Sequence, residues 1–379
     1  MKLLRITTIP LSLRFLLRGQ LRFMSQYYEV VAVSSGDVEF DVMLNEQQVR
    51  GCRVNMTRKI TPLADLKSLF ILICLFRKEK PDIVHTHTPK AGLLGMLAAW
   101  ITRVPVRLHT VAGLPLLVAT GNKRRLLVFV ERLTYACATK VYPNSFKMLQ
   151  IIIDNKWAKI EKVKVIANGS SNGIDTSFFS PDASFPRLER ETGTFTFCFV
   201  GRIVKDKGIN ELVGAFVRLY KDNKKVRLLL VGPFERELDP VLPQTEEYIL
   251  HHPGIRFVNF QNDVRPFLAA SDALAFPSYR EGFPNVVMQA GAMGLPSIVT
   301  DINGCNEIII DGENGMIIPL RNEEKLYETM KYFLENPAEV RGMAEKARLL
   351  VVSRYEQKMV WSSILKEYQS LCIKTFSKE

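Results

Sequence analysis

The chain alternates short apolar runs with longer amphipathic stretches, and it does so in two successive series. The first series of strand-like runs lies at 3–7, 29–33, 82–85, 106–110 and 140–141, with helical patterns such as 65–78 and 123–137 between runs. The second lies at 195–200, 226–231, 255–260, 273–276 and 297–300. Several runs of the second series are apolar almost throughout, as strands buried on both faces of a parallel sheet are. The alternation predicts βαβ units in two doubly wound α/β domains.

A turn-rich segment at 180–186, Ser-Pro-Asp-Ala-Ser-Phe-Pro, separates the two series and is typical of a linker. We therefore predict an N-terminal Rossmann-like domain over 1–182 and a C-terminal one over 190–355, facing each other across a cleft. A chain of 379 residues with 47% hydrophobic content can supply two cores of ordinary size. Ligands of such sheets bind at the carboxyl ends of the strands.

The net charge of +12 favours anionic partners, which are phosphorylated substrates, an anionic membrane surface or nucleic acid. The positive charge is dispersed and no nucleic-acid-binding motif is present, so we expect no nucleic acid partner. The six cysteines are scattered, which favours reduced thiols over disulfides or a zinc site. No signal peptide is recognisable, and the longest apolar run, 69–76, is far shorter than the roughly 20 residues of a membrane-spanning helix. We expect a cytoplasmic protein, either soluble or peripheral on the inner face of the cell membrane.

The most informative segment is 278–296, where a Gly-Phe-Pro-Asn turn precedes a helix that should begin near Asn285. Free backbone N–H groups and the positive end of the helix dipole would favour a bound diphosphate there. Glu281 could accept hydrogen bonds from sugar hydroxyls, and Gln289 follows about one helical turn after the start. The alternative is a capped, buried helix with a surface glutamate. The dense glycine and proline punctuation favours the binding interpretation.

A second segment, 200–208, reads as strand, glycine turn and helix, and it carries Arg202 and Lys207. The planar guanidinium and the mobile ammonium can converge on one anion. Sugar transfer needs such groups, because negative charge builds on the leaving diphosphate as the glycosidic bond breaks. Alone the segment could be an ordinary basic turn. With the segment 278–296 it indicates a nucleotide-sugar site.

Both segments resemble the signature of the retaining glycosyltransferases of family 4, which have the GT-B fold. The family patterns are G-R-x4-K-G and E-G-F-P-x4-E-A-x3-G-x-P. The similarity extends over nearly the whole chain, through 81–90, 172–175, 229–232 and 307–315. Within the family, the chain is most similar to the enzymes that build capsule, O-antigen or lipid-linked oligosaccharides in bacteria.

The resemblance implies that Arg202 and Lys207 hold the donor diphosphate and stabilise the leaving group, and that Glu281 contacts the transferred sugar. The implied donor-binding positions are Gly201, Gly282, Phe283, Pro284, Asn285 and Gln289. Candidate contacts to the acceptor or sugar are His87, Lys90 and His109. The GT-B fold also implies that the C-terminal helix, about 357–379 with Trp361, crosses back onto the first domain.

The implied reaction moves a hexose or N-acetylhexosamine from a nucleoside diphosphate, expected to be UDP, to a saccharide or polyprenyl-pyrophosphate-linked acceptor with retention of configuration. No cofactor and no metal ion are implied. His85 and His87 share a strand face, but the sequence offers no third or fourth ligand nearby. Two other functions stay open, a non-catalytic sugar-nucleotide-binding partner subunit and a sugar-nucleotide epimerase.

Two positions depart from the family pattern. Gln289 stands where relatives usually have a glutamate that binds the ribose; an amide still accepts and donates hydrogen bonds but loses the charge-assisted bond. Ala112 stands where many relatives have a histidine close to the reacting sugar, and His87 or His109 could replace it. We expect weaker or altered ribose binding.

The segment 11–24 is apolar and carries Arg14, Arg18 and Arg22 at four-residue spacing, which on one helix would form a basic stripe. Such a helix could lie in a membrane interface and attract anionic lipids. It could equally be a core helix whose arginines reach out to solvent.

Overall fold

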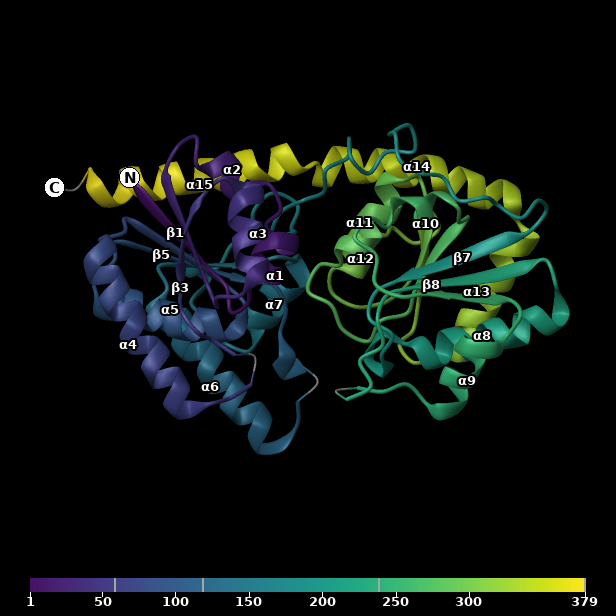
Figure 1. The fold of residues 1–379 in the computed structure, drawn as a ribbon, viewed down its shortest axis with the longest axis horizontal. Helices are drawn as coiled ribbons and strands as arrows, with labels where there is room; N and C mark the ends of the chain where they lie inside the picture. Colours follow the sequence, from purple (N-terminus) through teal and green to yellow (C-terminus); the bar gives the residue numbers. More distant parts are fainter. Residues whose placement is uncertain (58, 118, 238, 378–379) are drawn as a thin grey trace. The chain divides into compact units, whose positions relative to one another are not determined.

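The computed structural model describes residues 1–57, 59–117, 119–237 and 239–377, and it divides into two compact units (Figure 1). The N-terminal unit contains 1–173 together with 358–379, and the C-terminal unit contains 174–357. Residues 174–182, predicted to end the first domain, thus belong to the second unit. The chain returns to the first unit through α15 (Gln357–Phe376). Residues 378 and 379, the end of the predicted crossing helix, lie outside the described part.

The N-terminal unit is built on a six-stranded parallel sheet in the order β3-β2-β1-β4-β5-β6. Its strands are β1 (Lys2–Ile6), β2 (Glu29–Ser34), β3 (Arg50–Arg53), β4 (Ile83–His87), β5 (Val106–Val111) and β6 (Lys140–Pro143). In register, Leu4 lies opposite Val31 on one side and Val84 on the other. The edge strand β3 was not predicted, because its sequence Arg-Gly-Cys-Arg has no apolar run.

Two helical layers cover this sheet (Figure 1). Side chains of one layer share a core with one sheet face, and they come from α4 (Pro62–Glu79), α5 (Pro89–Ile101), α6 (Gly121–Cys137) and α7 (Phe146–Asp154). The other layer contains α1 (Pro10–Leu16), α2 (Gln20–Met24), α3 (Val38–Gln47) and α15. Short 3-10 turns lie at Pro115–Leu117 and Ile160–Lys162.

The expectation of one helix over 11–24 is wrong. The first helix ends at Leu16, and Gly19, with the left-handed φ of 78°, is the N-cap of α2, so α1 and α2 are separate helices. Arg14 forms ion pairs with Glu39 and Glu46 of α3, at 2.8 and 2.7 Å. The segment therefore packs on α3, and no single helix carries the three arginines as one stripe.

The segment expected to return to the first domain is α15, which packs on the N-terminal sheet. The Trp361 Nε1 donates a hydrogen bond to Asn172 Oδ1 at 2.7 Å. Tyr368 lies deeper, where its hydroxyl accepts from Arg5 at 2.9 Å and contacts His85 Nδ1 at 2.5 Å. Arg5 is fully buried and has no carboxylate partner among the described residues, a feature that the sequence did not predict.

The C-terminal unit repeats the same strand order, β9-β8-β7-β10-β11-β12, with all neighbours parallel. Its strands are β7 (Phe195–Val200), β8 (Val226–Val231), β9 (Ile255–Val258), β10 (Ala273–Phe276), β11 (Ser297–Thr300) and β12 (Gly315–Ile318). Four of the five predicted runs coincide with strands. For the run 255–260 the strand ends two residues earlier, at Val258, and β12 was not predicted. The prediction of two doubly wound parallel sheets is confirmed.

The helices of this unit pack on the two faces of its sheet (Figure 1). On one face α8 (Ile209–Asp222) packs against α13 (Glu323–Glu335) and α9 (Pro243–His251). On the other, α11 (Asn285–Ala292) packs against α14 (Pro337–Tyr355) and the short α12 (Cys305–Ile308). The remaining elements are α10 (Arg265–Ala269) and the 3-10 turn η3 (Lys205–Lys207).

Candidate active site

The two motif segments lie side by side at one edge of the C-terminal sheet. The first, 201–208, follows β7, and the second, 277–285, follows β10, its hydrogen-bonded neighbour. Between these two strands the connections turn from one side of the sheet to the other. Such a switch point opens a crevice at the carboxyl ends of the strands, where ligands of open α/β sheets bind.

Close backbone packing holds the two loops together. Gly208 has φ 69°, and a Cβ there would collide with the carbonyl of Pro277. The backbone N–H of Tyr279 donates to the carbonyl of Asp206 at 2.9 Å. A glycine is therefore required at 208 both by its conformation and by the space available.

This packing brings Lys207 and Glu281 into an ion pair, with both side chains only 15% exposed. The Ser278 hydroxyl donates a second hydrogen bond to the same carboxylate oxygen, at 2.7 Å. The Lys207 ammonium also lies 5.6 Å from the ring centre of Phe276. The structure thus joins one predicted residue from each motif, on a partly dehydrated surface where electrostatic interactions are stronger than in water.

Arg202, the third predicted catalytic residue, forms an ion pair with Glu235, at 2.5 Å between Nη1 and Oε2. Glu235 lies in the loop after β8, the other neighbour of β7. Sequence reasoning missed Glu235. Its position just after the Leu-Leu-Val-Gly end of a strand was the available signal, because that end lies at the same sheet edge.

The Gly-Phe-Pro-Asn turn leads into α11, which begins at Asn285 as predicted. Pro284 occupies the N-cap, and no side chain caps the helix. Its first N–H groups therefore stay available to an external acceptor such as a phosphate oxygen. Asn303, after β11, fixes the turn from behind by donating its amide to the carbonyls of Glu281 and Gly282. No specific signal in the sequence points to Asn303.

The two remaining donor-site residues differ in burial. Phe283 is buried, with its ring 5.3 Å from that of Tyr355 in an edge-to-face arrangement. Gln289 is partly exposed on α11, and within the described residues its side-chain amide makes no hydrogen bond. Phe283 thus anchors the turn, whereas Gln289 has hydrogen-bonding groups free for a ligand.

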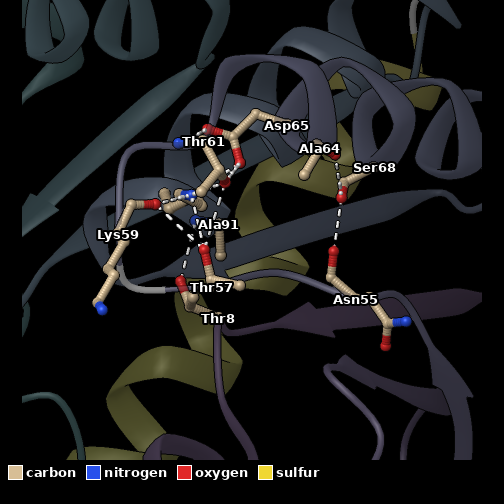
Figure 2. Close-up of polar contacts among 10 residues, drawn as sticks. Thr8, Asn55, Thr57, Lys59, Thr61, Ala64, Asp65, Ser68 and Ala91 are labelled. Atoms are coloured by element: carbon tan, nitrogen blue, oxygen red, sulfur yellow. Dashed lines mark hydrogen bonds and ion pairs between the residues drawn. The ribbon is translucent and has the colours of Figure 1, made fainter.

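Of the candidate acceptor contacts in the N-terminal unit, Lys90 holds a loop and a helix together. Its ammonium donates to the carbonyl of Lys59 and, at 2.7 Å, to Asp65 Oδ1 near the start of α4. Asp65 also accepts from the Thr61 hydroxyl at 3.0 Å. Figure 2 shows Lys59, Thr61 and Asp65 gathered around these contacts. Lys90 therefore has a structural task, and its contact with an acceptor stays a prediction.

His87 and His109 lie inside the same unit, 1% and 2% exposed. His87 Nε2 lies 2.9 Å from an Arg5 nitrogen, and His109 Nδ1 lies 2.8 Å from the Thr86 hydroxyl. Burial is the main cause that lowers the pKa of both rings, that of His109 to about 4. Both imidazoles are therefore neutral at pH 7 and hydrogen-bonded within the fold, so their role toward a sugar also stays a prediction.

The N-terminal sheet has its own switch point, between β1 and β4. Thr88, which follows β4, has φ 72°, an unusual conformation for a β-branched residue. The Thr8 hydroxyl, after β1, lies 2.8 Å from that of Thr88. It also accepts from the N–H of Ala91 at 3.3 Å, and Figure 2 labels both Thr8 and Ala91. Strain of this kind concentrates at functional sites. The two loops follow neighbouring strands at the carboxyl edge of the sheet, where ligands of open α/β sheets bind.

Comparison with known proteins agrees with this geometry. One family model, described as "Glycosyl transferase 4-like domain", matches residues 21–169, and another, "Glycosyl transferases group 1", matches 181–350. Over 384 aligned positions the chain is 32% identical to the capsular polysaccharide biosynthesis glycosyltransferase CapM of Staphylococcus aureus, covering 100% of this chain and 98% of the relative. The chain belongs to this glycosyltransferase family.

This glycosyltransferase is also similar to a second enzyme in sequence and to a solved structure in fold. It is 30% identical, over 70% of each chain, to an Escherichia coli enzyme named UDP-Gal:alpha-D-GlcNAc-diphosphoundecaprenol alpha-1,3-galactosyltransferase. The crystal structure of Anabaena HepE in complex with UDP superimposes with a TM-score of 0.77 at 18% identity, over 98% of this chain and 100% of HepE. The second likeness shows the GT-B fold, as predicted.

In the part of the glycosyltransferase that the structure describes, the cysteine beside the donor-site turn is not a thiolate nucleophile. Cys305, at the start of α12, is fully buried. Burial, and then the negative charge of Glu281, raise the pKa of its thiol well above the usual range. The thiol therefore stays protonated and acts as a small apolar group. Among the described residues, no helix is both long and apolar enough to cross a membrane.

Proposed function

We propose that this glycosyltransferase transfers a hexose or N-acetylhexosamine from a UDP-sugar to a saccharide or lipid-pyrophosphate-linked acceptor during the assembly of a surface polysaccharide. The observation that carries the proposal is the meeting of Lys207 and Glu281 at the β7/β10 switch point, beside the uncapped start of α11. Arg202 lies on the same loop as Lys207. A cation pair, a carboxylate and free N–H groups together suit the diphosphate and the sugar of one donor.

The cations act on the leaving group. Arg202 and Lys207 are each paired with a glutamate, Glu235 and Glu281. A donor diphosphate would compete with these carboxylates, and the carboxylates would keep the cations oriented toward the crevice. Negative charge that develops on the diphosphate during bond cleavage is then stabilised by groups already in place, and such preorganised charge is a main source of rate enhancement in many enzymes.

The sugar would be oriented by Glu281, whose second carboxylate oxygen is available to hydroxyl groups. With the Cys305 thiol protonated and Glu281 orienting the sugar, we propose retention by attack of the acceptor hydroxyl from the face that the diphosphate leaves. The leaving phosphate oxygen takes the proton of that hydroxyl. Positive charge from Arg202, Lys207 and the start of α11 takes the place that a metal ion has in other transferases.

The nucleotide and acceptor are proposed from the relatives. The Escherichia coli relative is named for UDP-Gal and a GlcNAc-diphosphoundecaprenol acceptor, and the Staphylococcus aureus relative for capsular polysaccharide biosynthesis. A net charge of +12 suits two anionic substrates. The C-terminal unit would bind the donor, and the N-terminal unit the acceptor.

The test is sugar transfer by the purified full chain from a panel of UDP-sugars to a lipid-pyrophosphate-linked monosaccharide. We expect a transferred sugar of unchanged anomeric configuration, and a rate lower by about a hundredfold or more in Glu281→Gln. Glu335→Gln, an exposed glutamate at the end of α13, is the matched control and should keep the rate. UDP binding without any transfer would instead indicate a non-catalytic partner subunit, and conversion of the UDP-sugar without an acceptor would indicate an epimerase.

A further inference from the structure

The outer face of α4 exposes large apolar side chains that the fold does not use. Leu63, Leu66 and Phe70 are 85%, 63% and 65% exposed, at a spacing that puts them on one side of the helix. The opposite side packs into the core through Leu72 and Phe76. An apolar side chain exposed alone needs no explanation, but three on one helix face indicate an interaction surface.

The outer face of α6 repeats the pattern. Phe129 is 62% exposed and Leu126 lies one turn earlier, also exposed. Arg125 and Arg132 lie on the same side of this helix and are exposed. Glu131, the only acidic residue of α6, faces the interior and is 5% exposed.

The charge around these side chains is of one sign. Between residues 57 and 132 the sequence has thirteen Lys or Arg and four Asp or Glu. None of the four acids is free at the outer surface: Asp65 binds Lys90, Glu79 binds Lys2 and Arg50, Asp82 accepts from the backbone of Lys2, and Glu131 is buried. On α4, by contrast, Lys67, Arg77 and Lys78 are exposed, and none of them has an ion-pair partner within the described residues.

The two helices belong to the same layer of the N-terminal unit. α5 lies between α4 and α6 and contacts both, and all three contribute to one core beneath them (Figure 1). The outward faces of both helices therefore lie on the same side of the sheet, facing away from it. We name this surface, formed by Leu63, Leu66, Lys67 and Phe70 of α4 and Arg125, Leu126 and Phe129 of α6, the α4–α6 face.

We propose that the α4–α6 face docks on an anionic lipid bilayer. Apolar side chains would enter the boundary between headgroups and acyl chains, and the basic residues around them would contact the headgroups. Complementary charge selects this occupant, because a second copy of the chain would bring two basic surfaces together. The inference goes beyond the proposed function and does not rest on it, since the face lies outside the donor site. The segment 11–24 offers less net positive charge than its sequence suggests, because Arg14 pairs with Glu39 and Glu46.

The experiment is co-sedimentation of the full chain with vesicles of phosphatidylcholine alone and of phosphatidylcholine mixed with phosphatidylglycerol. Four variants are compared with the natural chain. Two change the α4–α6 face, Leu66→Glu with Phe70→Glu and Lys67→Glu with Arg125→Glu, and Leu349→Glu is an apolar control. Leu349 is 70% exposed on α14 of the other unit. A charge control, Arg341→Glu with Lys346→Glu, changes two exposed basic residues of the same helix. Thermal unfolding verifies that each variant is folded.

We expect binding only to the anionic vesicles, weakened by salt. Loss of each basic residue weakens membrane binding about fivefold, so Lys67→Glu with Arg125→Glu should weaken it by about 25-fold or more. Leu66→Glu with Phe70→Glu should weaken it at least tenfold, since each buried apolar side chain contributes roughly a factor of ten. The α14 variants should bind as the natural chain does.

Three results would overturn the proposal: no binding to anionic vesicles, equal loss in the α14 variants, or a natural chain that is dimeric in light scattering and becomes monomeric in Leu66→Glu with Phe70→Glu. None of these assays needs a donor or an acceptor. A failure here would therefore leave the proposed transfer reaction untouched, and absence of transfer would leave membrane docking untouched.

Discussion

Gly304 is the position where the packing of the donor site can be tested by one added methyl group. It precedes α12 with φ 79°, and its backbone lies against the Gly-Phe-Pro turn. A Cβ at this position would lie 2.5 Å from the carbonyl oxygen of Gly282 and 2.9 Å from Phe283 Cα and Pro284 Cδ. Real Cβ atoms stay beyond 3.0 Å, so the turn must move by at least about half an ångström in Gly304→Ala.

The energetic consequence has two parts. Alanine at a position of positive φ costs about 1–2 kcal/mol, and overpacking against backbone atoms adds about 1–3 kcal/mol. Gly312→Ala is the matched control, because Gly312 has φ 75° in the same unit and an added Cβ there meets no atom within 4 Å. We expect Gly312→Ala to lose about 1–2 kcal/mol of unfolding free energy and Gly304→Ala about 2–5 kcal/mol.

Donor binding separates the two variants further. A shift of the turn moves Glu281 and the first N–H groups of α11, and displacements of about 1 Å in such sites cost about a hundredfold in activity. We expect Gly304→Ala to bind UDP at least tenfold more weakly and Gly312→Ala to bind it normally, by calorimetry at a temperature where both are folded. Equal UDP affinity and equal stability of the two variants would refute this role of the turn.

Three further predictions concern pH and metal. His85, His87 and His109 have pKa values below the ordinary 6.5, mainly because burial disfavours the imidazolium. Above about pH 6.5 these histidines are neutral in both the folded and the unfolded chain. Below that pH only the unfolded chain takes up protons, so the unfolding free energy falls by up to about 1.4 kcal/mol per pH unit for each histidine. Urea titrations should show this decrease, which for His109 ends at about pH 4. A flat profile between pH 6.5 and 5 would contradict their burial. Burial also raises the pKa of Glu131 to about 7. Between about pH 4.5 and 7 the unfolded chain loses this proton before the folded chain does, so the carboxyl lowers the unfolding free energy as the pH rises. Glu131→Gln should therefore raise the unfolding free energy by up to about 3 kcal/mol at pH 8 and change it little at pH 4.5. Equal effects of Glu131→Gln at both pH values would be inconsistent with a buried neutral carboxyl. Finally, a chelator should leave sugar transfer unchanged if Arg202, Lys207 and α11 supply the positive charge, and a loss restored by Mg²⁺ or Mn²⁺ would disprove that.

Sequence periodicity was enough to predict most of the fold. Strands such as β7, β8 and β10 are apolar almost throughout, and this pattern is typical of a parallel sheet buried on both faces. The edge strand β3 lacks this apolar pattern, and its sequence Arg-Gly-Cys-Arg shows no alternation of apolar and polar residues that would predict a strand. The break at Gly19 was missed because the apolar and basic spacing on either side fits one helix, and a single glycine does not by itself show its φ.

The donor site was partly predictable for a different reason. Lys207 and Glu281 lie in glycine- and proline-rich turns, which leave a local signature, and the structure brings them into contact. Glu235 and Asn303 lie in loops without such a signature, and only the strand order places them at the same edge. For His87 and His109, the sequence shows a titratable group but not its burial, which depends on segments distant in the sequence, such as Arg5 of β1 beside His87 and Tyr135 of α6 beside His109.

Binding of uridine diphosphate by the loops after β7 and β10 is the property on which the proposed function depends. Calorimetric titration of the full chain with UDP, GDP and ADP tests it, with Arg202→Ala and, as a control, Arg236→Ala, an exposed arginine paired with Glu246. We expect UDP to bind in preference to GDP and ADP. We also expect affinity about ten- to a hundredfold weaker in Arg202→Ala, through loss of a charged hydrogen bond, and unchanged in Arg236→Ala. Absence of any nucleotide binding, or equal UDP affinity in Arg202→Ala, would contradict this assignment of the donor site.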